Sequence, residues 1–276
     1  MKPAAKAALI SKSVFLAGCV FLALFPIFWV IMSSFKTNAE IMGGAISLPS
    51  QFSFAGYVQA ITISPIPKFF LNSIVISFSA TFLNVLFLSM AAYVFARFTF
   101  RHKNKLYFIL SLSMIIPMTA LLQPVYIVIK SLNLINTMQG LILVYTALNM
   151  PMSLIILRAA FSSIPRGLEE AAYLDGAGFA RTFFQIIVPA AKGGISSAAV
   201  LTFLDCWNEF TFALMLNSSQ NVRTLPLSLN YFRSQFSFNY TAMFAAITMA
   251  VLPSVLIFAL FQEQVVRSLT AGAVKE

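Results

Sequence analysis

Long apolar segments, separated by short polar ones, make up most of the chain. Five segments contain no Lys, Arg, Asp or Glu: 13–35, 69–96, 106–129, 131–157 and 234–262. A sixth apolar segment, about 194–216, is interrupted only by Asp205 and Glu209. Each is long enough for an α-helix to cross about 30 Å of hydrocarbon, which takes roughly 20 residues. The pattern predicts an all-α membrane protein with six transmembrane helices.

The composition agrees with a membrane protein, since 59% of the residues are hydrophobic and only 9% are charged. Soluble domains contain about 25% charged residues. The first apolar segment is too long for the core of a secretory signal peptide, and no small-x-small cleavage site precedes Lys36. We therefore expect it to remain as a membrane helix. Pro117 and Pro124 should kink the third helix, about 106–129.

The basic residues are distributed unevenly between the two sides of the predicted membrane. With a cytoplasmic N-terminus, the cytoplasmic side holds thirteen of them: Lys2, Lys6, Lys12, Arg97, Arg101, Lys103, Lys105, Arg158, Arg166, Arg181, Lys192, Arg267 and Lys275. The opposite side holds Lys36, Lys68, Lys130, Arg223 and Arg233. Because Lys and Arg gather in cytoplasmic loops, both termini are predicted to be cytoplasmic. The net charge of +10 thus reflects topology rather than binding to nucleic acid.

The longest polar interruption, residues 161–192, is predicted to begin with a short helix over about 165–174. Ser163 and Pro165 suit the beginning of that helix, and two acidic residues in its early turns suit the positive end of the helix dipole. After it, Gly176 and Gly178 can adopt positive φ angles, which would end the helix and turn the chain.

The residues that follow, "FARTFFQIIV", predict a second short helix, and Pro189 marks its junction with the fifth membrane helix. The first short helix combines acidic residues with a partly apolar face of Leu168, Ala171, Ala172 and Tyr173. Helices that lie on a membrane surface are usually rich in Lys and Arg on the polar face. An acidic helix therefore favours a docking surface for a cytoplasmic partner over an idle helix at the membrane surface.

Residue types that support catalysis are scarce in this chain. It contains no Gly-Lys dipeptide, so it lacks the Walker A loop that binds nucleotide phosphates. One histidine, His102, cannot supply a multi-histidine metal site, and Cys19 and Cys206 fall in different predicted spans. We expect neither an enzyme nor a metal site.

Two acidic residues interrupt the fifth predicted span. Asp205 and Glu209 are four residues apart, which places them on one helical face, with Asn208 adjacent. An unpaired aspartate at the centre of a span costs ~2.5–3.5 kcal/mol, so these groups should face the interior or water. Two interpretations remain open: Asp205, Asn208 and Glu209 line a pathway for a hydroxylated solute, or they hold helices together by internal hydrogen bonds.

The predicted outer loop between the last two spans, about 217–240, contains residue types that are common in binding hot spots. Arginine and aromatic side chains bury much area or form several hydrogen bonds. The loop contains Arg223, Tyr231, Phe232, Arg233, Phe236 and Tyr240. We expect residues 221–233 to project furthest from the membrane, and Tyr240 to anchor at the membrane interface.

A spaced motif in the polar segment carries a family resemblance. Glu170-Ala171-Ala172, then Gly176, Ile186 and Val188-Pro189 resemble the EAA loop of membrane subunits of ATP-binding-cassette (ABC) importers, with Val188 where Leu is commoner. "DCWNEFTFALML", "TLPLSL" and the C-terminal "AGAVKE" resemble permeases of the carbohydrate-uptake branch, particularly the smaller six-helix subunit of the maltose-type pair. The resemblance extends from about residue 65 to the end, and Glu276 stands where Gly is usual.

The resemblance implies a type I ABC importer permease fold, in which residues 1–68 form an N-terminal helix and outer loop and residues 69–276 form the permease core. It also implies that the EAA loop, residues 161–192, couples this chain to a cytoplasmic ATPase. The coupling residues would be Glu169, Glu170, Ala171, Ala172, Asp175, Gly176 and Pro189.

The same resemblance implies the partners. A homologous second permease would complete a heterodimer, and an ABC ATPase dimer would bind ATP and Mg²⁺, which leaves this chain without a cofactor. An extracytoplasmic solute-binding protein would deliver a sugar or oligosaccharide and dock at Arg223, Tyr231 and Arg233. The expected location is the bacterial cytoplasmic membrane.

Other functions remain open at this point. An ABC permease could carry another polar solute, such as glycerol 3-phosphate. A secondary transporter would fit Asp205 in part, but no internal repeat is visible. A membrane assembly protein without a transport role would explain the acidic segment but not the intramembrane acids.

Overall fold

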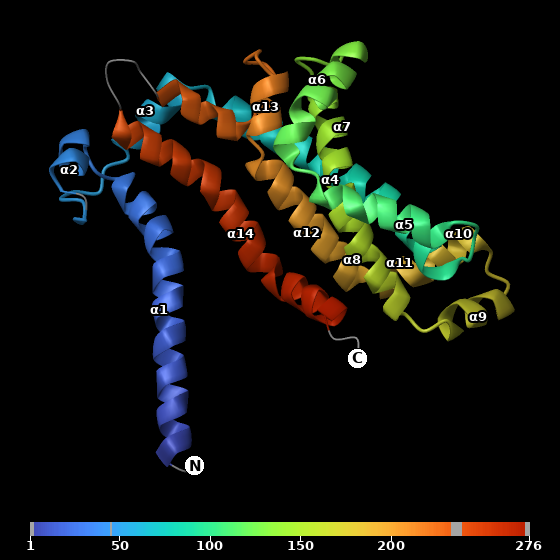
Figure 1. Cartoon of the computed structure of the whole chain (residues 1–276). Coiled ribbons are helices and arrows are strands. Elements are labelled where there is room, and N and C mark those ends of the chain that lie inside the picture. Colours follow the sequence, from blue (N-terminus) through green and yellow to red (C-terminus); the bar gives the residue numbers. More distant parts are fainter. Residues whose placement is uncertain (1–2, 45, 233–238, 274–276) are drawn as a thin grey trace. The chain divides into compact units, whose positions relative to one another are not determined.

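The computed structural model describes residues 3–44, 46–232 and 239–273 of the chain, with side chains described from residue 11 to residue 263 within those ranges and at Val266. All regular elements in these ranges are helices, which confirms the all-α class. Three helices are long and apolar enough to cross a membrane (Figure 1): α1 (Pro3–Ser33), α4 (Ile66–Arg97) and α14 (Tyr240–Ala273).

Three further candidate spans are pairs of helices that bend sharply at a break. The segment Lys103–Ile115 bends by 100° against Met118–Ser131, Met138–Leu148 by 51° against Met150–Ser163, and Phe179–Ala190 by 77° against Lys192–Asn208. If each pair is one span, the described chain holds six candidate spans, the number predicted, although the last pair begins at Phe179, inside the predicted loop 161–192, and ends at Asn208 rather than near residue 216. The elements are α5 (Lys103–Leu112), η1 (Ser113–Ile115), η2 (Met118–Leu121), α6 (Leu122–Ser131), α7 (Met138–Leu148) and α8 (Met150–Ser163).

The kink predicted at Pro117 is confirmed as a complete break in the third helix, and the fourth predicted span is broken as well, with a proline next to each break. Pro117 lacks an N–H group, and its ring disfavours helical geometry in the preceding residue. Ile116 accordingly has an extended backbone (φ −69°, ψ 122°). Pro151 lies in the first turn of α8, next to the second break. Pro124 lies in the first turn of α6, a position that tolerates proline, and so begins a helix rather than kinking one.

The chain forms two compact units, each made of two stretches of sequence. The first unit contains residues 1–67 and 228–252, and the second contains 68–227 and 253–276. In the first unit, α2 (Asn38–Gly43) and α3 (Ala55–Ile63) follow α1. The Asn38 side chain accepts hydrogen bonds from the N–H and hydroxyl groups of Thr241, and Trp29 contacts Phe244 edge to face.

The second unit is built on close packing of α8 against α12 (Lys192–Asn208) (Figure 1). Gly194 permits this approach, because a Cβ atom there would lie 2.2 Å from the Cβ of Ala160. The hydroxyls of Ser153 and Thr202 form a buried hydrogen bond of 3.1 Å between the same helices.

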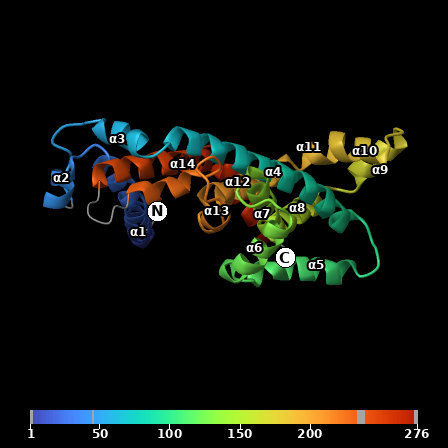
Figure 2. The same cartoon turned by 90° about the horizontal axis from the view of Figure 1, so that it is seen from above.

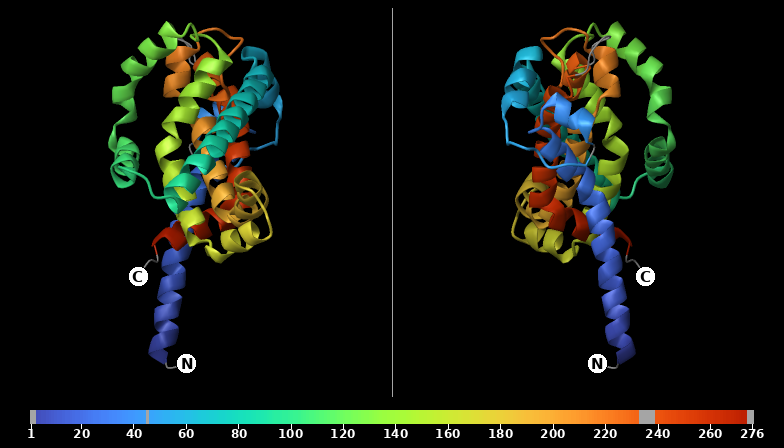
Figure 3. Two further views of the ribbon diagram at one scale, coloured as in Figure 1. Left: turned by 90° about the vertical axis from the view of Figure 1, so that its right-hand side faces the viewer. Right: turned by 90° about the vertical axis from the view of Figure 1, so that its left-hand side faces the viewer.

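The predicted EAA loop and the short helix over Thr211–Leu216 lie at opposite ends of this second unit (Figure 1). The EAA loop contains α9 (Gly167–Leu174), α10 (Phe179–Thr182), η3 (Phe183–Ile187) and α11 (Val188–Ala190). Figure 2 shows these elements together at one end. The short helix α13 (Thr211–Leu216) lies at the other end, as Figure 3 shows.

Candidate functional site

The first short helix of the EAA loop is present as predicted. α9 spans Gly167–Leu174 and carries Glu169 and Glu170 in its first turn. The predicted role of Ser163 in starting it is wrong. Ser163 is the last residue of α8, where its hydroxyl donates to the carbonyl of Ala160, and α9 has no side-chain cap.

The turn after α9 depends on one glycine rather than two. Gly176 has a positive φ of 77°, and its N–H group donates to the carbonyl of Tyr173. The prediction of a left-handed residue is therefore confirmed for Gly176. It is wrong for Gly178, which has φ −74° and ψ 168° and precedes α10 in an extended conformation.

The second short helix is also present, but it includes an unpredicted π-helical turn. α10 is followed without a gap by the π-helical η3, then by α11 with Pro189 in its first turn. The chain then bends by 77° into α12. The expected junction near Pro189 is thus present, one turn after the π-helical segment.

A buried ion pair fixes the EAA loop to α4. The Nε atom of Arg97 lies 2.8 Å from Oε1 of Glu169, and the two side chains are 7% and 13% exposed. A second guanidinium nitrogen of Arg97 donates to the carbonyl of Ile164, just before α9. In the sequence, Arg97 is notable only as one of the basic residues on the predicted cytoplasmic side. No local spacing relates two residues that are 72 positions apart.

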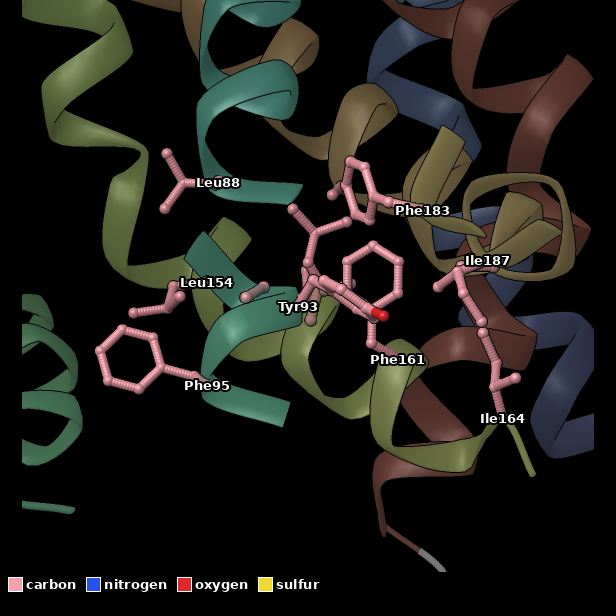
Figure 4. Packing of buried hydrophobic residues seen from close by; sticks show 13 residues of the cluster. Leu88, Tyr93, Phe95, Leu154, Phe161, Ile164, Phe183 and Ile187 are labelled. Atoms are coloured by element: carbon pink, nitrogen blue, oxygen red, sulfur yellow. The ribbon is translucent and has the colours of Figure 1, made fainter. Parts of the chain in front are cut away.

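Aromatic packing joins the same loop to α4 and α8 (Figure 4). The ring of Tyr93, from α4, lies 5.8 Å from that of Phe161 in α8 and 4.9 Å from that of Phe183 in η3. Ile164 and Ile187 are buried in the same cluster. Because offset and edge-to-face ring pairs pack tightly, this cluster makes the loop a firm extension of the helices beneath it.

The outward surface of α9 combines acidic and apolar side chains. Leu174 is 89% exposed, and Leu168, Tyr173 and Glu170 are also exposed. Ala172 is buried, so its predicted place on the outward face is wrong. Ala171 and Asp175 remain exposed beside the others. A surface of this kind, held on a rigid base, suits docking of another protein.

The fifth predicted span does not continue as one helix through both of its acidic residues. α12 ends at Asn208, and Glu209 has an extended backbone (φ −67°, ψ 127°) before α13. The Glu209 carboxylate accepts hydrogen bonds from the N–H groups of Phe212 and Ala213, at 2.7 and 3.0 Å. The free N–H groups of α13 thus find an acceptor. The prediction that Asp205 and Glu209 share one helical face is wrong for this reason.

The structure separates the three residues for which a solute pathway and an internal hydrogen-bond network were both left open. Glu209 belongs to an internal network, because the Tyr145 hydroxyl also donates to it at 2.7 Å. Asp205 and Asn208 are exposed. Asn208 accepts from the Ser254 hydroxyl, whereas Asp205 has no hydrogen-bond partner within the part of the chain that the structure describes. Their role in a solute pathway stays a prediction.

The outer segment predicted for binding-protein docking is tied down more closely than expected. Asn72, on α4, donates to the carbonyls of Asn221 and Arg223. Leu225 and Leu227, at the start of η4 (Leu225–Phe232), are 0% and 1% exposed. Residues 221–227 are thus packed in part against α4, and the expectation that 221–233 projects furthest from the membrane stays a prediction.

The candidate docking residues in this segment lie in different surroundings. Arg223 and Tyr231 are half-buried. Arg233 and Phe236 lie outside the described residues, and Tyr240 begins α14.

Over the described ranges, no three His, Cys, Asp or Glu side chains lie close enough to hold a metal ion.

Comparison with known proteins identifies the family of this chain. Residues 87–271 match the family described as binding-protein-dependent transport system inner membrane component. The chain is 36% identical to the diacetylchitobiose uptake system permease NgcG of Streptomyces coelicolor, over 91% of this chain and 84% of that one. It is 34% identical to the sulfoquinovosyl glycerol transport system permease SmoH of Agrobacterium fabrum, over 95% and 93%.

Two further comparisons agree. The trehalose/maltose transport system permease MalG of Thermococcus litoralis is 32% identical, over 96% of this chain and 98% of that one. A chain in the crystal structure of a bacterial ABC transporter involved in the import of alginate has the same fold, with a TM-score of 0.82 at 21% identity over 95% and 98% of the two chains. The chain therefore belongs to the family of binding-protein-dependent transport system inner membrane components, the membrane permease subunits of ABC importers.

Proposed function

We propose that this permease is one of two homologous membrane subunits of an importer for a sugar or oligosaccharide, in a bacterial cytoplasmic membrane. The names of three relatives, which concern diacetylchitobiose, sulfoquinovosyl glycerol and trehalose/maltose, support a carbohydrate-type solute. A separate ATPase dimer binds ATP and Mg²⁺, and an extracytoplasmic binding protein delivers the solute.

The outward surface of α9 is the observation that carries the coupling role. Glu170 and Leu174 are exposed there, while Glu169 is held by Arg97 beneath them. One face of the helix is thus free to bind the ATPase, and the other is fixed to the membrane helices. When the ATPase closes on ATP, its movement shifts the balance between two states of the permease through contacts that differ between those states.

The solute pathway includes the exposed part of α12. Asp205 and Asn208 offer a carboxylate and an amide, which can accept hydrogen bonds from sugar hydroxyls or donate to them. A carboxylate in a membrane span requires water or a polar partner, so the exposed Asp205 side chain fits a hydrated passage rather than lipid. Glu209 acts indirectly, since it holds the start of α13 in place.

Docking of the binding protein involves the outer segment around Arg223, with Tyr231 and Arg233. Ser218 and Asn221, which precede Arg223 in the same unit, are also exposed. The hydrogen bonds of this segment to α4 support a docking surface that is formed before the partner arrives, which lowers the entropic cost of binding.

The proposed function is tested by purification of the tagged chain from its native membrane, followed by reconstitution into liposomes. A second permease and a Walker-type ATPase should copurify. Uptake of the sugar held by the binding protein should require ATP inside the liposome. Uptake driven by an ion gradient without ATP would contradict the proposal in favour of a secondary transporter, and uptake of glycerol 3-phosphate alone would contradict the sugar assignment.

The role of α9 is tested separately by Glu170→Lys. Because Glu170 is exposed, the change should leave the fold intact but weaken ATPase docking, so that uptake per ATP hydrolysed falls. Glu170→Gln is the matched control, since it removes the charge without reversing it. Normal uptake and normal stimulation of ATP hydrolysis in the lysine variant would contradict the coupling role.

A further inference from the structure

The helix α4 differs from the bent pairs that accompany it in the second unit. It runs for 32 residues from Ile66 to Arg97 without a break. At 1.5 Å per residue its length is about 48 Å. The pairs α5–α6, α7–α8 and α10–α12 each bend by more than 40° at a break. A continuous helix transmits a displacement along its axis, whereas a break absorbs part of it.

One end of α4 is fixed to the EAA loop. Arg97, its last residue, forms the ion pair with Glu169 at 2.8 Å and donates to the carbonyl of Ile164 at 2.7 Å. The guanidinium group therefore holds the loop on both sides of the start of α9. Charge-assisted hydrogen bonds of this kind have defined geometry, so a movement of α9 must displace Arg97 or break them.

The opposite end of α4 is fixed to the outer segment 217–227. Nδ2 of Asn72 donates to the carbonyl of Asn221 at 3.0 Å and to that of Arg223 at 2.9 Å. Two neighbouring residues add one bond each: Lys68 donates to the side chain of Asn221 at 2.6 Å, and the Ser73 hydroxyl accepts from the N–H group of Leu225 at 2.8 Å. Ser73 is buried and Asn72 is 5% exposed, so water competes little for these bonds.

We propose that α4, through Arg97 at one end and Asn72 at the other, carries the movement of the EAA loop to the outer segment 217–227. Arg97 and Asn72 are thus positioning residues for the transport cycle. The inference rests on the proposed function, because it assigns a route between the ATPase-docking surface and the binding-protein side. It gives two segments of one chain, at opposite ends of the same unit, a direct mechanical connection.

The experiment measures the outer segment while the ATPase is held in different states. Gln220→Cys places a thiol at an exposed position of that segment, in a background with Cys19→Ser and Cys206→Ala. The assembled transporter is labelled with a membrane-impermeant thiol reagent, with and without trapped nucleotide. The readout is the ratio of the two labelling rates, which a purely structural role of Arg97 would leave unchanged in a folded complex.

Arg97→Gln should bring this ratio to about 1 while basal ATP hydrolysis continues. Arg101→Gln is the matched control, because Arg101 is exposed and forms no ion pair with any described residue; it should keep the ratio of the parent. Arg97→Glu combined with Glu169→Arg should restore part of the ratio. If Arg97→Gln fails to assemble, Asn72→Ala tests the other end of α4 and should give the same loss.

Two results overturn the inference. If Arg97→Gln and Asn72→Ala keep the ratio of the Arg101→Gln control, the movement travels through other helices. If the Gln220→Cys parent shows no dependence on nucleotide while its uptake still requires ATP, the segment does not move and the inference falls alone; if its uptake does not require ATP, the proposed function falls with it. The two failures are therefore distinguishable.

Discussion

The hydroxyl of Tyr145 donates a 2.7 Å hydrogen bond to the carboxylate of Glu209 and so joins α7 to the break between α12 and α13. Tyr145 is 1% exposed. The same carboxylate accepts from two N–H groups of α13. Three donors thus converge on one acidic side chain, which makes it the structural centre of this end of the unit.

Glu209→Ala should destabilise the protein more than any change at Asp205. It leaves the Tyr145 hydroxyl and two N–H groups without their acceptor, at a cost of about 1–3 kcal/mol for each group that stays buried. Thermal unfolding in detergent should show the loss. Tyr145→Phe should cost about 1.5–3 kcal/mol. The matched control is Tyr126→Phe, whose hydroxyl has no partner among the described residues. Equal midpoints for the two tyrosine variants would contradict the role of Glu209.

Cysteine labelling should separate the residues of the fifth span. In a background without Cys19 and Cys206, Asp205→Cys and Asn208→Cys should react with a small, membrane-impermeant thiol reagent, because both native side chains are exposed. Glu209→Cys should react slowly. The rates at the first two positions should change when ATP is trapped in the complex. Complete protection of Asp205→Cys in every nucleotide state would contradict a hydrated pathway.

Gly176 and Gly178 should respond differently to alanine. Gly176 has φ 77°, where a Cβ atom costs about 1–2 kcal/mol, so Gly176→Ala should reduce the population of the native turn about 5- to 30-fold. Gly178 has φ −74°, and a Cβ atom there would meet nothing within 4 Å. Uptake per ATP hydrolysed should therefore fall for Gly176→Ala and remain normal for Gly178→Ala. The reverse order would show that the turn is not what couples the loop.

The contact between α8 and α12 should not tolerate an added methyl group. Gly194→Ala would place a Cβ atom 2.2 Å from that of Ala160, and overpacking of this kind costs typically about 1–3 kcal/mol. Adding Ala160→Gly should restore much of the stability. Gly193→Ala is the control, because a Cβ atom at Gly193 meets nothing within 4 Å. The unfolding midpoint of each purified variant provides the measurement, and additive losses in the double variant would contradict the contact.

The segment that contains α2 should loosen at low pH. Hydrogen bonds from the Ser50 side chain, from the N–H groups of Thr37 and Ser50, and from the Thr37 side chain lower the pKa of Glu40 from 4.5 to about 2. The stabilisation is complete above pH 4.5 and is lost as the pH falls toward 2, because the folded segment favours the ionised form.

Pepsin cleavage of residues 36–53 in the reconstituted protein provides the measurement for Glu40. Cleavage should rise between pH 4.5 and 2 for the native sequence. For Glu40→Gln, which is neutral throughout, the rate relative to a reference substrate should stay constant over that range. A pH dependence that persists in Glu40→Gln would assign the effect to another group.

Local patterns in the sequence predicted the parts of the structure that depend on neighbouring residues. α9 and the left-handed Gly176 follow from first-turn acids and a glycine at a helix end, so both were predictable. Pro117 indicated a kink in the third helix, but the sequence could not predict that the bend would reach 100°. The size of the bend depends on what the two halves pack against.

Contacts between distant residues were beyond prediction from one sequence. Arg97 and Glu169 are separated by 72 positions, and Asn72 and Arg223 by 151, so no periodicity connects them. The prediction that Glu209 shares a helical face with Asp205 failed because the four-residue spacing assumes a continuous helix, whereas α12 ends at Asn208. The internal network was one of the two interpretations left open, but its partner Tyr145 was not predictable, because that contact depends on the fold of the whole unit.

The π-helical turn η3 has a consequence for how the docking surface is oriented. A π-helical turn accommodates one residue more than an α-helical turn does, and it is usually a local insertion in a regular helix. Each residue of an α-helix advances the rotation by about 100°. The extra residue in Phe183–Ile187 therefore sets the angular phase between α10 and α12 by chain length rather than by side-chain identity. A one-residue deletion there would point the outward surface of α9 in a new direction, even with every coupling residue unchanged.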